Sequence, residues 1–227
     1  MRTLLVSPDY LSHYLPLSAI GSALRARGHD VLVATGPGLR ERVVDDGFSH
    51  VELRLGAGRN RGLSEFDDQE DAARANLARF LAATEHGMVA TLEYQAEKRL
   101  EDLLWEPEAV TARLRAIVRD LEPSIVVSDQ LAFGASVALR AIGIPYVSFL
   151  PGHPCQLPPK GVPFGFPSRR PAEFAPPHHE LHRLERLCTS VAVEFTGRFN
   201  ATLRSLSPNA NPVSDAFGTR SECCRTS

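Results

Sequence analysis

The first 35 residues constrain the fold of this chain most strongly, because they read in turn as strand, loop, helix and strand. An apolar run at 3–7 leads into a proline-containing loop, and apolar residues then recur at helical spacing at Leu17, Ile20 and Leu24. Gly28 ends this helix before a second apolar run at 30–35. Two strands joined by a helix in this way form a parallel βαβ unit, which requires a sheet covered by helices.

The same pattern, a glycine between a helical stretch and an extended stretch, recurs further along the chain. Gly47 and Gly143 each follow a helical stretch and precede an extended one. Repeated units of this kind predict an α/β fold with a doubly wound, Rossmann-like parallel sheet flanked by helices. We place its strands near 3–7, 30–35, 50–55, 124–128 and 145–149.

The remaining segments are assigned by composition and periodicity. Residues 72–121 are rich in helix formers, and Pro107 is placed to begin a helix within them. A proline-rich loop follows the fifth strand, and residues 178–206 are helical again. We predict one domain over residues 1–206 and an irregular or disordered tail over residues 207–227.

Composition excludes several classes of function. A net charge of −2 gives no general attraction to nucleic acid or to an anionic membrane. No secretory signal and no apolar run long enough to span a bilayer is found, so we expect a cytoplasmic protein that binds neither nucleic acid nor membrane. The four cysteines lack the paired spacing of a zinc site, and we expect free thiols and no bound metal.

The residues that carry chemistry lie at strand ends. Ligands of a doubly wound sheet bind at the carboxyl ends of the strands, near the point where the strand order reverses. His13 follows the first strand and Asp129 ends the fourth, and these strands are expected to be neighbours. We therefore predict a hydrogen bond of about 2.6–3.2 Å between the two side chains, which leaves the second imidazole nitrogen as a general base.

Other histidines and serines allow weaker interpretations. A cluster at the start of the last helix could suggest a metal site, but it lacks the H-E-x-x-H order and fits a solvated helix face better; it comprises His178, His179, Glu180 and His182. His153 follows the fifth strand and either lines the site or shapes its loop. No G-x-S-x-G elbow surrounds a serine, which argues against acyl transfer.

Three segments together resemble a known family. They are Ser12-His13-Tyr14-Leu15-Pro16, the stretch from Leu24 to Val31, and the stretch from Ser128 to Gly134 followed by Gly143-Ile144-Pro145. In this combination the chain, over most of residues 1–205, is similar to the N-terminal half of a GT-B glycosyltransferase. The nearest branch is the bacterial family 1 enzymes that decorate macrolides and other antibiotics. That family usually has glycine where this chain has Ser12, a departure that bears on the geometry of the loop.

The resemblance implies an inverting sugar transfer. The histidine matching His13 would remove a proton from an acceptor hydroxyl, and the aspartate matching Asp129 would orient that histidine. An apolar, hydroxylated natural product would lie against residues 56–104 and the proline-rich loop. The candidate acceptor contacts, of which the four phenylalanines and the methionine could equally be core residues, are Ser12, Phe66, Phe80, Met88, Phe149, His153 and Phe164.

The donor site that the resemblance implies is missing. No glycine-rich phosphate loop follows any predicted strand, so we expect the second GT-B domain to be absent and the chain alone to be inactive. No cofactor is expected beyond a nucleotide-sugar co-substrate, bound mainly by that other domain. Two further interpretations remain, an acceptor-binding subunit of a split enzyme with a separate donor-domain chain, and an unrelated Rossmann nucleotide-dependent enzyme. The latter is disfavoured because residues 7–12 lack G-x-G-x-x-G.

Overall fold

Five parallel strands form the centre of the molecule. The computed structural model describes residues 1–56, 71–102, 104–152, 158–167, 169–170 and 172–218. The strands are β1 (Arg2–Val6), β2 (Asp30–Thr35), β3 (Ser49–Glu52), β4 (Ile125–Asp129) and β5 (Val147–Phe149). Their order is β3-β2-β1-β4-β5, and every neighbouring pair is parallel. The predicted α/β class, the strand positions to within a few residues and the pairing of the first with the fourth strand are confirmed.

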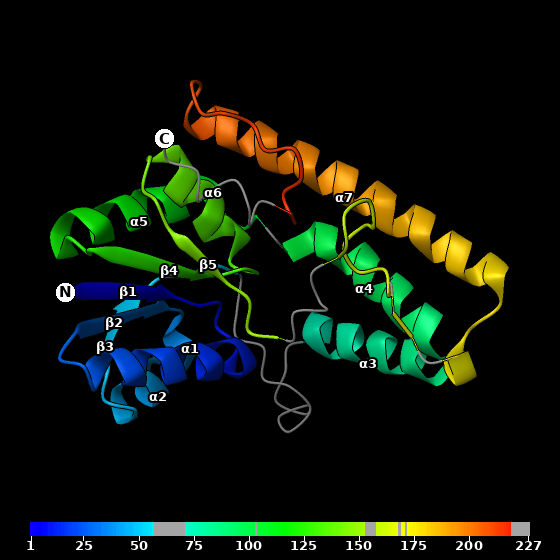
Figure 1. The fold of residues 1–227 in the computed structure, drawn as a ribbon, viewed down its shortest axis with the longest axis horizontal. Coiled ribbons are helices and arrows are strands. Elements are labelled where there is room, and N and C mark those ends of the chain that lie inside the picture. Colours follow the sequence, from blue (N-terminus) through cyan, green and yellow to red (C-terminus); the bar gives the residue numbers. More distant parts are fainter. Residues whose placement is uncertain (57–70, 103, 153–157, 168, 171, 219–227) are drawn as a thin grey trace.

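Helices cover both faces of this sheet (Figure 1). One face carries α1 (Leu11–Arg25) and α2 (Arg40–Asp45), with the short 3-10 helix η1 (Pro37–Leu39) between β2 and α2, and the other carries α5 (Pro107–Leu121) and α6 (Phe133–Ala141). Alternate residues of a strand point to opposite faces, so Leu5 packs with α1 and Leu4 packs with α5 and α6. Pro107 begins α5, as predicted.

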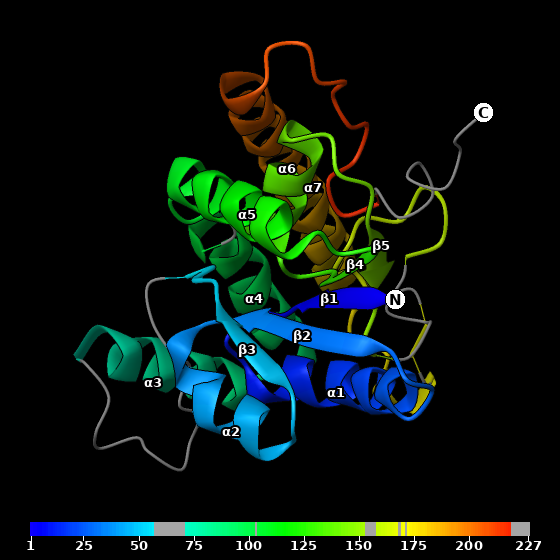
Figure 2. The same ribbon diagram turned by 90° about the vertical axis from the view of Figure 1, so that its left-hand side faces the viewer.

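A group of three helices stands beside the sheet. It consists of α3 (Asp71–Glu85), α4 (Met88–Asp102) and the long α7 (His178–Leu206), which is preceded by the 3-10 helix η4 (Ala172–Phe174). The break between α3 and α4 was not predicted; it occurs at Gly87, whose φ of 94° suits glycine. Helix α4 packs along α7, where Arg183 donates two hydrogen bonds, of 2.6 and 3.1 Å, to the carboxylate of Glu93. The carboxyl ends of the strands point towards this group (Figure 1), and Figure 2 shows the sheet from the opposite end.

The segment after α7 is irregular but packed. Residues 207–218 contain no helix or strand, yet Val213, Ala216 and Phe217 are only 3–4% exposed. The ring of Phe217 lies 5.4 Å from that of Phe133 on α6 and 4.7 Å from that of Phe164. Residues 207–218 therefore pack on the core of the domain although they are irregular, and the predicted boundary at 206 stays a prediction. An irregular segment has no hydrophobic period, so periodicity cannot detect its packing.

Helix α1 is fastened to the turn that follows α2. The buried phenol of Tyr14 donates a hydrogen bond of 2.7 Å to the carboxylate of Asp46, which also accepts one of 3.0 Å from Arg42. Arg25, at the other end of α1, donates to the backbone carbonyl of Asp46 and lies over the ring of Phe48. Burial, and then the hydrogen bond to Asp46, raise the pKa of Tyr14 far above its usual range, so the phenol stays a donor.

These contacts predict an acid-dependent loss of stability. Partial burial opposes ionisation of Asp46, but hydrogen bonds from Tyr14 and Arg42 outweigh it and lower the pKa of the carboxyl. A carboxyl whose pKa is lower in the folded than in the unfolded state stabilises the protein at neutral pH, and this contribution is lost as the pH falls below about 4.

The pH dependence can be measured by urea unfolding of the parent chain and of Asp46→Asn between pH 7 and pH 3. The difference in unfolding free energy between them should shrink as the pH falls. A constant difference over this range would contradict a stabilising charge on Asp46. Asp120→Asn is the matched control, because Asp120 is an exposed partner of Arg119.

None of the helices within the described ranges is both long and apolar enough to cross a membrane.

Candidate active site

The structure brings His13 and Asp129 together at the carboxyl ends of β1 and β4. Nδ1 of His13 lies 2.9 Å from Oδ2 of Asp129, within the distance predicted from the sequence. The register of the sheet explains this contact, because Val6 pairs with Ser128 and the residues after β1 therefore leave the sheet beside the end of β4. His13 itself lies in the first turn of α1, which begins at Leu11.

The Asp129 carboxylate is fully buried and satisfied. Its Oδ1 accepts a hydrogen bond of 2.8 Å from the backbone N–H of Leu131, and its Oδ2 faces the imidazole. A buried carboxylate is costly unless it is hydrogen-bonded in this way. An ionised carboxylate only accepts, so Nδ1 of His13 carries the proton and Nε2 is left as the basic nitrogen.

The imidazole of His13 remains partly accessible to solvent. The side chain of His13 is 17% exposed, whereas that of Asp129 is 0% exposed. A histidine oriented by a buried carboxylate and open to solvent can take a proton from a bound hydroxyl group at Nε2. The pair can therefore serve as a general base with its orienting group.

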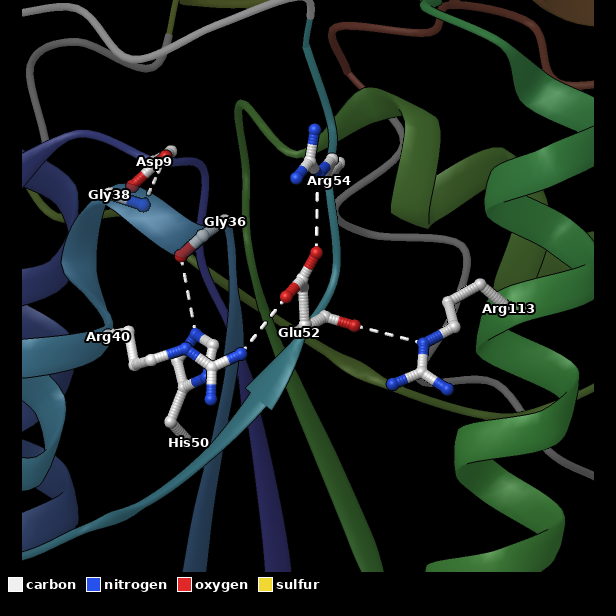
Figure 3. A network of polar contacts seen from close by, with 8 residues as sticks. All are labelled: Asp9, Gly36, Gly38, Arg40, His50, Glu52, Arg54 and Arg113. Carbon is white, nitrogen blue, oxygen red and sulfur yellow. Dashed lines mark hydrogen bonds and ion pairs between the residues drawn. The ribbon is translucent and has the colours of Figure 1, made fainter.

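The loop that leads from β1 into α1 is held by the end of β2 and by the 3-10 helix η1 that follows it. Oδ2 of Asp9 accepts a hydrogen bond of 3.1 Å from the backbone N–H of Gly38, as Figure 3 shows. The carbonyl of Pro8 accepts one of 3.3 Å from the Thr35 hydroxyl. A Cβ atom at Gly36 would lie 2.4 Å from Oδ2 of Asp9, so only glycine allows this close approach. These contacts fix the path of the chain just before His13.

A groove of about 700 Å³ runs between the edge strand β3 and α5, and neither His13 nor Asp129 lines it. Glu52 on this edge accepts hydrogen bonds from Arg54 and Arg40, which together lower the pKa of its carboxyl (Figure 3). Arg113 of α5 donates to the backbone carbonyl of Glu52 at 3.0 Å. This network ties α5 to the open edge of the sheet, and side chains that occupy the edge hinder pairing with another strand.

The predicted acceptor contacts fall into different places. Ser12 is exposed beside His13, and Phe149 pairs with Asp129 in the sheet while its ring packs against the core under α1. Phe80 and Met88 lie on α3 and α4, where the Phe80 ring is 5.9 Å from that of Tyr94.

Phe164 is partly buried, and its ring stacks on that of Phe217 at the margin of the core beneath α6 and α7. Phe66 and His153 lie outside the described residues. The assignment of acceptor contacts therefore stays a prediction.

Sequence reasoning missed two features of the site. The ring of Tyr10 lies 6.0 Å from that of His13, and the Leu131 N–H binds Asp129 from two residues further along the chain. The second was detectable, because an aspartate at the end of a strand commonly accepts from the N–H two residues on.

The alternative metal site gains no support from the described part of the chain, where no cluster of three or more potential ligands is found. In the candidate cluster on α7, His182 instead lies 3.9 Å from Glu185, an exposed pair on one helix.

Two glycosyltransferases are similar in sequence to part of this chain. Erythronolide mycarosyltransferase of Saccharopolyspora erythraea is 29% identical over 169 residues, which cover 67% of this chain and 37% of that protein. Elloramycin glycosyltransferase ElmGT of Streptomyces olivaceus is 32% identical over 117 residues, 49% of this chain and 30% of that protein. The matched regions thus span about a third of each relative's length.

Among solved structures, that of glycosyltransferase VinC in complex with DTDP aligns with a TM-score of 0.46 and 18% identity. The alignment covers 94% of this chain and 45% of that chain.

The family comparison covers most of the chain. Residues 22–211, which include Asp129 and begin after His13, match the family described as "Erythromycin biosynthesis protein CIII-like, N-terminal domain". The five-stranded parallel sheet with helices on both faces is the architecture of one GT-B half, as predicted. The chain therefore belongs to the family of erythromycin biosynthesis protein CIII-like N-terminal domains.

Proposed function

We propose that this chain is the acceptor-binding part of an inverting glycosyltransferase, with His13 as the general base and Asp129 as its orienting group. The observation that carries this proposal is the 2.9 Å contact between Nδ1 of His13 and the fully buried Asp129 at the carboxyl ends of β1 and β4. The contact leaves Nε2 free to act on a substrate hydroxyl group.

In the proposed reaction, Nε2 of His13 removes the proton of an acceptor hydroxyl group as its oxygen attacks the anomeric carbon of a nucleotide sugar. A new C–O bond forms on one face of the sugar, and the bond to the nucleoside diphosphate breaks on the opposite face, so the configuration inverts. The diphosphate leaves with the bonding electrons. The Asp129 carboxylate stabilises the imidazolium until the imidazolium releases its proton to water.

The acceptor is proposed to be an apolar, hydroxylated natural product. The names of the relatives, an erythronolide mycarosyltransferase and an elloramycin glycosyltransferase, support an acceptor of this class and a sugar as the transferred group. The helices α3 and α4, which carry Phe80 and Met88, stand on the side towards which the strand ends point (Figure 1).

The donor is proposed to be a nucleotide sugar that a second domain holds. The relatives are much longer than the stretch they share with this chain, which supports a donor-binding part beyond that stretch. That part is either a continuation of the same polypeptide or a separate chain. Sugar transfer can be measured after this chain is mixed with a separately produced donor half. Activity of the mixture would favour a separate chain, because only a split enzyme requires its halves to associate without a covalent link.

Calorimetry of the isolated chain tests whether this chain binds the acceptor and the other half binds the nucleotide sugar. We expect weak binding of hydroxylated aromatic or macrocyclic aglycones, because one half of a cleft buries only part of the ligand. We expect no micromolar binding of any nucleotide sugar.

The matched control ligand is the same aglycone with its hydroxyl group methylated, which keeps the apolar contacts and removes the hydrogen bond to His13. Failure of every aglycone to bind would contradict the acceptor role. Micromolar binding of a nucleotide sugar would contradict the placement of the donor site elsewhere.

A further inference from the structure

We propose that Tyr14 and Asp46 are positioning residues for His13, because the hydrogen bond between them fixes the rotation of α1 about its own axis. The inference rests on the proposed function only for its effect on turnover; its effect on the His13 contact can be measured separately.

The two contacts hold α1 from different sides. Successive residues of an α-helix point about 100° apart around the axis. His13 reaches Asp129 at the end of β4, and Tyr14 reaches Asp46 in the turn after α2, at 2.7 Å. Any rotation of the helix that lengthens one contact also displaces the other. A catalytic group must be held within roughly 0.5 Å and 10–20° of its productive geometry, so a second anchor of this kind matters.

The first turn of α1 needs such an anchor because it is poorly stabilised by its own sequence. Its N-cap residue, Tyr10, makes no side-chain capping bond, and no acidic residue lies in the first turn. Pro16 lies inside the helix and has no N–H to donate to the carbonyl of Ser12. Leu11 in this turn and Leu15 just after it are 49% and 40% exposed, so they contribute little packing. Tyr14, which is fully buried, is the residue of this turn that reaches the core.

The anchor is itself rigid. The carboxylate oxygen that accepts from Tyr14 also accepts a hydrogen bond of 3.0 Å from Nε of Arg42, which fixes the position of the oxygen. Hydrogen bonds to an ionised acceptor are about twice as strong as those between neutral groups. The phenol ring packs among Leu5, Leu17 and other residues of the core under α1. The hydroxyl group therefore cannot turn to another acceptor unless the ring leaves that core.

The test uses variants that remove or restore the hydrogen bond between Tyr14 and Asp46. Tyr14→Phe keeps the ring and removes only the donor, and Asp46→Ala removes the acceptor together with the ion pair to Arg42. Asp46→Asn keeps an acceptor oxygen for the Tyr14 phenol, so the contact between His13 and Asp129 should stay close to that of the parent chain. Tyr94→Phe is the matched control, because its phenol donates an equivalent bond of 2.8 Å to the carbonyl of Asn76, between α3 and α4.

The readout is the proton NMR signal of the His13 Nδ1–H in the isolated chain and its rate of exchange with water. Tyr14→Phe and Asp46→Ala should each speed this exchange about fivefold, the factor that corresponds to about 1 kcal/mol for one hydrogen bond. The double variant should show little more than either single one, because the two residues act through the same bond. Tyr94→Phe should leave the exchange unchanged.

Exchange in Tyr14→Phe equal to that of the parent, with only a lower melting temperature, would overturn the positioning role. In the enzyme completed with a donor half, Tyr14→Phe should lower kcat about fivefold and leave the KM for the acceptor unchanged. An unchanged kcat for His13→Ala in that enzyme would instead contradict the proposed function, and the NMR result would still decide the role of Tyr14.

Discussion

His13→Ala is expected to lower the turnover of the proposed transferase, completed with a donor half, by roughly a hundredfold or more. Without the imidazole, the acceptor hydroxyl must attack while it still carries its proton, or lose it to water. The KM for the acceptor should change little, because the general base contributes mainly in the transition state. The measurement is kcat at saturating acceptor and donor. The loss should persist across neutral pH, because the alanine side chain accepts no proton at any pH.

His179→Ala is the matched control for this experiment. His179 is exposed at the start of α7, and its removal should leave turnover unchanged. Near-normal turnover of His13→Ala would place the general base elsewhere, and His153→Ala would then be the next variant to measure.

Asp129→Asn is expected to lower turnover by a comparable factor, roughly a hundredfold or more, without unfolding the domain. The asparagine oxygen can still accept the hydrogen bond from Leu131, which now comes to Oδ1 of Asp129 at 2.8 Å. The amide NH₂ then faces Nδ1 of His13 as a donor and favours the tautomer with the proton on Nε2. In that tautomer Nε2 cannot accept the acceptor proton, and the charge that stabilised the imidazolium is gone.

A single-turnover assay, combined with circular dichroism to confirm folding, measures this effect. Asp30→Asn provides the control, since Asp30 is a surface aspartate paired with Arg2 at the opposite ends of the strands. If Asp129→Asn kept near-normal single-turnover rates while folded, Asp129 would not orient the base.

The central contact of the site could be predicted because it depends on strand order. Gly28 and Gly47, which end helices just before strands, indicated parallel βαβ units. The geometry of a doubly wound sheet then places the first and fourth strands side by side. Residues that end those strands, or follow them, must then meet. His13 and Asp129 lie 116 positions apart and still contact each other, in agreement with this rule.

Contacts outside regular elements could not be predicted in the same way. The packing of Phe217 on Phe133 and Phe164 joins three segments without any shared period. The bond between Tyr14 and Asp46 depends on the short helix α2 and the turn after it, whose placement is not encoded locally. Gly87 separates α3 from α4 within a stretch that otherwise favours helix, and a glycine within such a stretch does not by itself mark a helix end.

The sequence alone therefore determined the fold class, the strand order near the candidate site and the contact between His13 and Asp129, because periodicity and strand–helix alternation are local properties. The tertiary structure decided how Phe164 and Phe217 pack, how residues 207–218 return to the core and how α1 is held. These depend on long-range packing and on hydrogen bonds between side chains distant in sequence, such as Tyr14 and Asp46. Their free energies arise only when the surrounding elements have already come together.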